Sequence, residues 1–163
     1  MPKSVFVPVL AVALTGLLLT GLGSAGEKKP DEQAKEVVRT FFKALHARDV
    51  EGSLKMMDVP WVGLFSNELV KDREELKKQW GQFLKEAKFE GEPKFTIKEV
   101  LNFPRFREKY KEKIEQRKLN KALDQLKLTV DDRVVLEQTG KSGGSAILVR
   151  MRDGKSKIVG IIE

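Results

Sequence analysis

The chain has 163 residues, 40% of them hydrophobic, and its 31 basic and 24 acidic residues give a formal net charge of +7 at neutral pH. This length fits one domain that buries a core without the help of a metal or a disulfide. Because the sequence contains no cysteine, it excludes both a disulfide framework and a lipid-modified cysteine.

The first residues have the layout of a secretory signal. Lys3 is the only charged residue before Glu27, and the uncharged stretch between them is rich in Val and Leu and ends in small residues up to Ala25. This layout predicts a signal peptide over residues 1–25 and a protein exported to the periplasm or the medium. An uncleaved membrane anchor is the alternative, since the stretch is nearly long enough to span a bilayer. Contact with a membrane is expected only in that case.

Residues 26–31 form a polar linker, and residues 32–163 are predicted to form a single α+β domain. Its first helix extends to about residue 47, with Asp31 as its cap. Asp49 is expected to cap a second, short helix that Pro60 ends. The apolar stripe of the first helix consists of Ala34, Val37, Val38, Phe41, Phe42 and Leu45.

An irregular strand over 61–65 and a third helix follow. Asp72 and Glu75 have the spacing of a capping box, and the apolar residues behind them recur at helical spacing. From residue 94 the period shifts to two, which predicts a strand that Pro104 ends. Apolar residues of this strand share one parity with Glu99, namely Phe95, Ile97, Leu101 and Phe103.

A charged helical segment over 104–127 separates this strand from the last three, which are predicted at 133–139, 146–152 and 155–162. Between residues 105 and 121 it carries eight basic and three acidic residues, a balance of +5. Such a segment suits an acidic polymer, an anionic lipid or a nucleic acid. Its Lys and Glu residues also have the spacing of ion pairs on a solvated helix face. Since an exported protein meets little nucleic acid, no nucleic-acid partner is expected.

Asp153 and Gly154 form the strongest hairpin signal of the chain, because a two-residue turn with positive φ favours this pair. An unbroken pleat then predicts two faces for the last strand pair. The face toward the helices contains Ile147, Val149, Met151, Ile158, Gly160 and Ile162. The second face contains Leu148, Arg150, Lys157, Val159 and Ile161. We expect Leu148, Val159 and Ile161 to form a homodimer contact there.

The run Val-Val-Arg-Thr-Phe-Phe-Lys-Ala-Leu at 37–45, the Ala-Arg-Asp at 47–49, the helix over 72–84 and the closing hairpin resemble the nuclear transport factor 2-like superfamily. This superfamily has a cystatin-like, cone-shaped fold that also holds ketosteroid isomerases and polyketide cyclases. The resemblance implies three N-terminal helices packed on a curved, mainly antiparallel sheet. The segment 104–127 departs from it and is interpreted as an insertion at the mouth of the cone.

The catalytic set of those isomerases is not carried over to this sequence. The strand after the second helix, 61–65, has no titratable group, and the only tyrosine, Tyr110, lies in the charged segment. Glu99 and His46 are the weak catalytic candidates, because each lies on an apolar stripe. A bulge that turns Glu99 outward, or a salt bridge from it to Arg150 or Arg133, is the structural alternative. With one histidine and no cysteine, no metal site is expected.

The residues expected to contact a ligand are Phe41, Trp61, Trp80, Glu99 and Arg150. The resulting hypothesis is an exported module that binds a small apolar ligand or another protein, without a cofactor and without a recognisable catalytic set. One alternative is a lyase, isomerase or cyclase with Glu99 and His46 as acid and base. Another is a structural dimerising domain.

Overall fold

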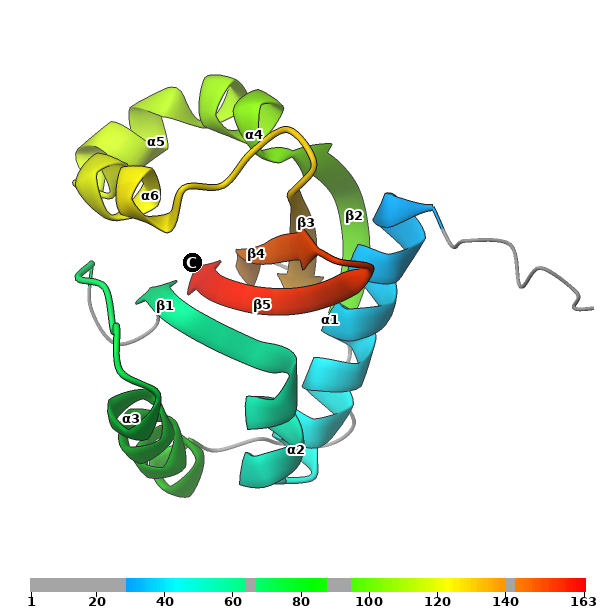
Figure 1. The fold of residues 1–163 in the computed structure, drawn as a ribbon, viewed down its shortest axis with the longest axis vertical. Coiled ribbons are helices and arrows are strands. Elements are labelled where there is room, and N and C mark those ends of the chain that lie inside the picture. Colours follow the sequence, from blue (N-terminus) through cyan, green and yellow to red (C-terminus); the bar gives the residue numbers. More distant parts are fainter. Residues whose placement is uncertain (1–28, 64–66, 88–94, 140–142) are drawn as a thin grey trace, which may run out of the picture.

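In the computed structural model of the protein, the described residues are 29–63, 67–87, 95–139 and 143–163. The predicted signal peptide lies outside the described residues, as does the end of the strand predicted at 61–65. The fold is α+β, with helices on both sides of a five-stranded sheet (Figure 1). The helices are α1 (Pro30–His46), α2 (Val50–Met56), α3 (Arg73–Glu86), α4 (Phe103–Lys109), α5 (Lys111–Gln116) and α6 (Asn120–Leu126). The strands are β1 (Met57–Gly63), β2 (Phe95–Asn102), β3 (Arg133–Thr139), β4 (Gly143–Arg152) and β5 (Lys155–Ile162).

The sheet is mixed and has the strand order β1-β5-β4-β3-β2. Strands β2 to β5 pair antiparallel, whereas β1 pairs parallel with β5. The predicted hairpin between β4 and β5 is confirmed: Arg152 lies opposite Lys155, and Asp153 and Gly154 have φ of 51° and 69°. Strand β5, the last strand of the chain, therefore lies between β4 and β1 in the interior of the sheet. The side chains on both of its faces must be packed against other elements.

The helix starts agree with the predicted caps in two cases of three. Asp49 accepts a hydrogen bond from the Gly52 N–H at 2.8 Å, and Asp72 accepts one from the Glu75 N–H at 2.9 Å. The cap predicted for the first helix is wrong, because Pro30 starts this helix and Lys29 precedes it. The Asp31 carboxylate lies in the first turn and instead accepts a hydrogen bond from Arg133 Nε at 2.6 Å.

Pro60 does not end the second helix, contrary to the prediction. Helix α2 ends at Met56, and Pro60 lies within β1 behind a cis peptide bond with Val59. Strand β1 then continues to Gly63, whose φ of +90° and close approach to the Ile161 carbonyl leave no room for a side chain. This contact holds the end of β1 against β5.

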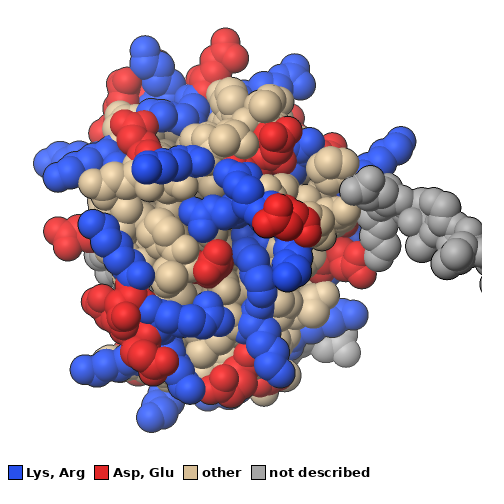
Figure 2. All heavy atoms as spheres, in the orientation of Figure 1, with Lys and Arg blue, Asp and Glu red and all other residues tan. Residues whose placement is uncertain are grey.

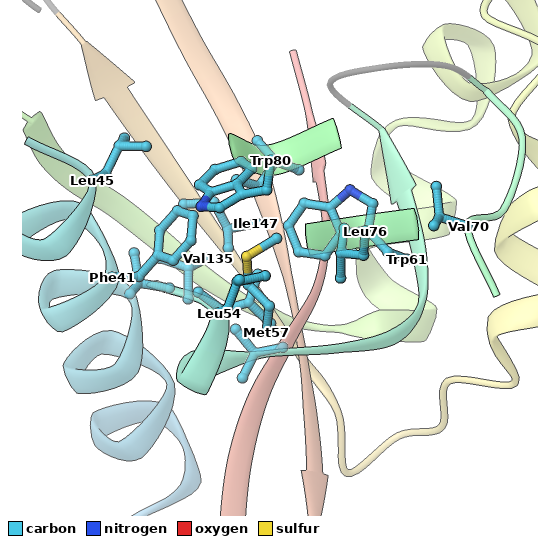
Figure 3. Packing of buried hydrophobic residues seen from close by; sticks show 14 of the residues in the cluster. Phe41, Leu45, Leu54, Met57, Trp61, Val70, Leu76, Trp80, Val135 and Ile147 are labelled. Atoms are coloured by element: carbon cyan, nitrogen blue, oxygen red, sulfur yellow. The ribbon is translucent and has the colours of Figure 1, made fainter. Parts of the chain in front are cut away.

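The first core cluster fills the space between helices α1 to α3 and one face of the sheet. Phe41, Trp61 and Trp80 are fully buried at its centre (Figure 3). The ring of Trp80 lies 5.4 Å from that of Phe41 and 6.2 Å from that of Trp61. Its Nε1 donates a hydrogen bond of 2.6 Å to the buried Ser53 Oγ. Aromatic rings in mutual contact thus occupy this side of the sheet.

The second core cluster fills the opposite side, between the sheet and the charged helical segment. This segment forms three short helices, α4 to α6, that arch over the strands (Figure 1). The interpretation of an insertion at the mouth of a cone is therefore corrected, because the segment covers a sheet face. Its buried residues are Phe103, Phe106, Ile114, Leu119, Ala122, Leu123 and Leu126. They pack against Val134, Ala146, Leu148 and Val159 of the sheet.

Two irregularities change the faces that an unbroken pleat predicts. The register of β4 and β5 shifts so that Leu148 lies opposite Gly160 and Val149 opposite Ile158. As a result Ile161 packs in the first cluster and Ile162 against the second, the reverse of the prediction. The register of β2 and β3 shifts in the same way between Ile97 and Glu99.

Candidate functional site

A pocket of about 420 Å³ opens between α4, α5 and the sheet. We call it the α5 pocket. It is lined by Phe106, Tyr110, Lys113, Ile114, Gln116, Arg117, Leu119, Leu136, Glu137, Gly144, Ser145, Ala146, Ile162 and Glu163. The end of β5, marked C in Figure 1, lies beneath the arch of these helices. The pocket thus lies on the side of the sheet opposite to α1, α2 and α3.

The floor of the α5 pocket is apolar. Phe106, Ile114 and Leu119 come from the helical segment and belong to the second core cluster. Each of the three is at most 3% exposed. Ala146 comes from β4, and Leu136 and Ile162 lie at the rim of the same cluster. These residues are held by the core itself, so the floor exists before any ligand binds.

One wall of the pocket is basic. Tyr110, Ile114 and Arg117 are separated by four and three residues, which places them on one face of the α5 turn. Lys113 lies beside them, with its Nζ 5.7 Å from the centre of the Tyr110 ring. Among the described residues, no carboxylate forms an ion pair with Lys113 or Arg117. Basic and acidic side chains alternate over the surface shown in Figure 2, with several basic ones around the arch.

The opposite wall is formed by β3 and β4. Glu137 borders the pocket, but it has the parity of Val135, and Val135 packs in the first core cluster on the other side of the sheet. Because β3 and β4 pair without a register shift, the pleat directs the Glu137 side chain away from the pocket. Glu137 is 5% exposed and has interactions within the protein. Its main chain therefore borders the pocket, while its carboxylate belongs to the other face.

Ion pairs hold the arch of helices in place. Arg107 of α4 lies 2.5 Å from Asp124 of α6 and donates a second hydrogen bond to Asn120 at 3.2 Å. Lys109 pairs with Glu99 of β2 at 2.5 Å, and this hydrogen bond raises the pKa of Lys109. These pairs join different elements and are not the pairs predicted within the segment, which were Glu112 with Lys109 and Lys113. Arg107 and Lys109 are therefore paired, and the basic residues that line the pocket are Lys113 and Arg117.

The aromatic residues predicted to contact a ligand do not line a cavity. Phe41, Trp61 and Trp80 are each 0% exposed and contact one another in the first core cluster. That prediction is wrong, because close ring packing has replaced the expected hollow of the cone. Their large side chains build the core that positions α1 and α3 against the sheet.

Glu99 does not face the interior, and this prediction is wrong as well. The register shift before Glu99 puts it on the side of Leu101 and the second cluster, where its half-exposed carboxylate pairs with Lys109. The predicted alternative of a bulge is confirmed, with a different basic partner. His46 ends α1 on the other side of the sheet and is half-buried. The proposed acid and base therefore do not meet.

Arg150 is a structural residue rather than a ligand contact. Its side chain is 15% exposed, and its guanidinium donates to the carbonyls of Val59 at 3.3 Å and Leu126 at 3.2 Å and lies 3.5 Å from Asp58 Oδ2. These bonds connect β4 with β1 and with the end of α6. Both terminal nitrogens of the guanidinium thus donate to the protein itself.

The surface predicted for dimerisation is not exposed. Leu148 and Val159 are 0% exposed beneath α4 to α6, and Ile161 is 5% exposed in the first cluster. This assignment is corrected because the charged segment covers the face that was expected to meet a second copy. The missed signal was in the sequence: the apolar residues of that segment required a surface to pack on.

Metal binding and membrane crossing each need a specific arrangement of residues, and the described ranges contain neither arrangement. Within them, no group of three or more His, Asp or Glu side chains is arranged to hold a metal ion. None of the helices in these ranges has the length and hydropathy needed to cross a membrane.

No protein-family model matches the sequence, and no curated protein matches it. Among solved structures, a protein of unknown function with a cystatin-like fold from Nostoc punctiforme is similar, with a TM-score of 0.44 and 13% sequence identity. The similarity covers 80% of this chain and 86% of that chain.

Proposed function

We propose that this protein is a binding module for a small molecule, and that the α5 pocket is its binding site. The observation that carries the proposal is the contrast between the two sides of the sheet. On one side Phe41, Trp61 and Trp80 fill the space. On the other, about 420 Å³ remains open above an apolar floor, a volume within the range of about 300–1,000 Å³ typical of ligand sites.

The walls supply the features that such sites combine. Buried apolar side chains offer contact area, and a small number of polar groups at the edge give orientation. Ile114 and Leu119 represent the first kind, and Tyr110, Lys113 and Arg117 the second. An acid and base pair is not assembled from Glu99 and His46, so we propose binding rather than turnover.

Export of this module and its membership of the nuclear transport factor 2-like superfamily are part of the proposal. The leader pattern over residues 1–25 supports export. The order α1, α2, β1 and α3, followed by strands β2 to β5 of a mainly antiparallel sheet, supports membership. Intact-mass measurement of secreted material tests export: loss of the first 25 residues is expected, and a membrane-bound full-length chain would contradict it.

The binding proposal is tested by filling the pocket. We expect wild-type protein to increase the fluorescence of N-phenyl-1-naphthylamine, a neutral apolar probe, and Ile162→Trp to abolish that increase. Thr40→Trp, at an exposed position of α1 on the opposite side of the sheet, is the matched control and should behave as wild type. Urea unfolding of the three proteins checks that each is folded. Equal probe fluorescence with folded Ile162→Trp would contradict the proposal.

A further inference from the structure

The chemistry of the α5 pocket also defines a class of ligand. We infer that the pocket binds an amphipathic carboxylate, with its charged head at Lys113 and Arg117 and its apolar body on the floor formed by Ile114, Leu136 and Ile162. This inference rests on the proposed function of the same pocket. It differs from the sequence-based expectation of an apolar ligand in the cone beneath α1 to α3.

The basic groups at the pocket are available to a ligand. Elsewhere in the arch the cations are already paired, Arg107 with Asp124 and Lys109 with Glu99. Lys113 and Arg117 have no such ion pair within the described part of the chain. Both are exposed, and Arg117 shares its helix face with Ile114 of the floor. Lys113 and Arg117 are four residues apart, a spacing that makes side chains neighbours on a helix surface. A guanidinium and an ammonium at neighbouring positions suit a carboxylate, because the first offers a bidentate fork and the second a mobile donor.

On the sheet wall, an anion would meet the carboxylate of Glu163 but not that of Glu137. The pleat of β3 turns the Glu137 carboxylate to the other side of the sheet, so the main chain of Glu137 and Ser145 borders the pocket there. Glu163 is exposed at the end of β5 and is the one acidic side chain left among the lining residues. The surrounding segment carries a balance of +5, which the pairing of Arg107 with Asp124 and of Lys109 with Glu99 reduces to +3. Its field extends over about 8 Å at physiological ionic strength and attracts an anion.

The arrangement also sets the orientation of the ligand. Lys113 and Arg117 lie at the solvent side, whereas Ile114 and Leu119 are buried beneath them. A carboxylate at this rim keeps part of its hydration, which limits the cost of removing a charge from water. Its hydrocarbon body gains from burial against the floor. An amphipathic anion therefore satisfies both regions at once, whereas a neutral or cationic amphiphile satisfies only the floor.

Calorimetric titration with three ligands of equal chain length tests the inference: decanoate and decylammonium below their micellar concentrations, and 1-decanol below its solubility limit. We expect wild-type protein to bind decanoate at least about tenfold more tightly than decanol, a factor that corresponds to about 1.4 kcal/mol. Decylammonium should bind least. The affinity for decanoate should fall as salt is added, and that for decanol should not.

Paired charge reversals identify the residues. Lys113→Glu with Arg117→Glu should weaken decanoate binding at least tenfold, in proportion to the loss of two charge-assisted contacts, and leave decanol unchanged. Lys111→Glu with Lys121→Glu changes the net charge of the same segment equally at exposed positions outside the pocket. This control should keep decanoate affinity within about twofold, because exposed charges at a distance are screened. Circular dichroism confirms folding, and Lys113→Gln with Arg117→Gln replaces the reversal if that variant fails to fold.

The outcomes separate the inference from the proposed function. If decanoate and decanol bind equally and the reversal has no effect, the pocket binds ligands but the assignment of an anion is wrong. An equal loss in the control pair would also overturn it, because the effect would then come from the general field. If none of the three ligands binds, the proposed function itself fails.

Discussion

Asp132 offers the sharpest test of how the two sides of the sheet are held together. This carboxylate is fully buried at the start of β3. Its Oδ1 accepts hydrogen bonds from the Met151 N–H at 2.8 Å and from Arg152 at 2.6 Å. Its Oδ2 accepts from the Thr129 N–H at 2.6 Å and from Arg152 at 3.1 Å. One side chain thus ties the loop after α6 to the hairpin of β4 and β5.

Asp132→Asn keeps the shape of this side chain and removes its charge. The amide group of Asn directs hydrogens at one of the N–H donors, which leaves a buried group unsatisfied at a cost of about 1–3 kcal/mol. Arg152 is 43% exposed and returns to water, so the lost ion pair adds only about 1 kcal/mol or less. We expect a total loss of about 3 kcal/mol, which at about 2–4 °C per kcal/mol lowers the Tm by roughly 6–12 °C.

The effect depends on pH with a defined sign. Burial alone would raise the pKa of Asp132, but hydrogen bonds from Arg152, Met151 and Thr129 outweigh it and hold this pKa below its ordinary value of 3.8. The stability that the carboxylate contributes is therefore complete above the unfolded pKa and is lost as the pH falls through the folded pKa. The difference between wild type and Asp132→Asn should be constant near neutral pH and shrink in acid.

Urea unfolding monitored by circular dichroism measures the difference, with a lower midpoint and an unchanged slope expected for the variant. The matched control is Asp131→Asn, at an exposed carboxylate one residue earlier. It removes the same charge without a buried partner and should shift the midpoint little. Equal midpoints for Asp131→Asn and Asp132→Asn would refute the structural role of the buried carboxylate.

Three further substitutions test the assignments of side chains to core and surface. Ser53→Ala removes the acceptor of the Trp80 indole N–H, so a loss of about 1–3 kcal/mol in urea unfolding is expected; no loss would show that another group satisfies Trp80. Glu99→Gln breaks a half-exposed pair with Lys109 and should cost no more than about 1 kcal/mol, whereas a larger change would place the carboxylate in the core. Val159→Glu buries a carboxylate beneath α4 to α6 and should lower the free energy of unfolding by about 3–5 kcal/mol. A stable Val159→Glu protein that changes only from dimer to monomer in sedimentation would restore the predicted dimer surface.

Much of the secondary structure follows from local patterns in the sequence. The apolar stripe of α1, the caps Asp49 and Asp72, and the Asp153 and Gly154 turn depend on interactions within a few residues, and each was predicted. These patterns also give the α+β class, because helical spacing dominates before residue 87 and alternation dominates after residue 132. Interactions between residues close in the sequence therefore determine most of the helices and strands.

The candidate site could not be predicted in this way. The positions of Glu99 and Ile161 were wrong because an alternating pattern gives the face of a side chain only while the pleat is unbroken. A single register shift reverses every later residue, and both shifts here arise from pairing with a neighbouring strand. Strand pairing is a long-range property that alternation does not contain.

The basic segment shows a second limit. The charged residues of this segment predict a solvated surface, and its apolar residues predict a packed one. Both predictions are correct, because the charged residues lie on the outer side of α4 to α6 and the apolar residues on the side that packs against the sheet. Which face of the sheet this segment covers depends on how the strands are connected, and the residue pattern of the segment does not predict that. The pocket forms where this cover ends, between Tyr110 of the helices and Ala146 of the sheet. Sequence reasoning therefore placed the ligand contacts on the side of the sheet that the first core cluster fills.

The most direct test of the central claim is a titration of isotope-labelled protein with decanoate, followed residue by residue in two-dimensional amide NMR spectra. The account predicts saturable shifts concentrated at the α5 pocket, at Tyr110, Ile114, Arg117 and Ala146. Shifts concentrated at Phe41 and Trp80, in the core beneath α1 to α3, would contradict it. So would the absence of any saturable shift.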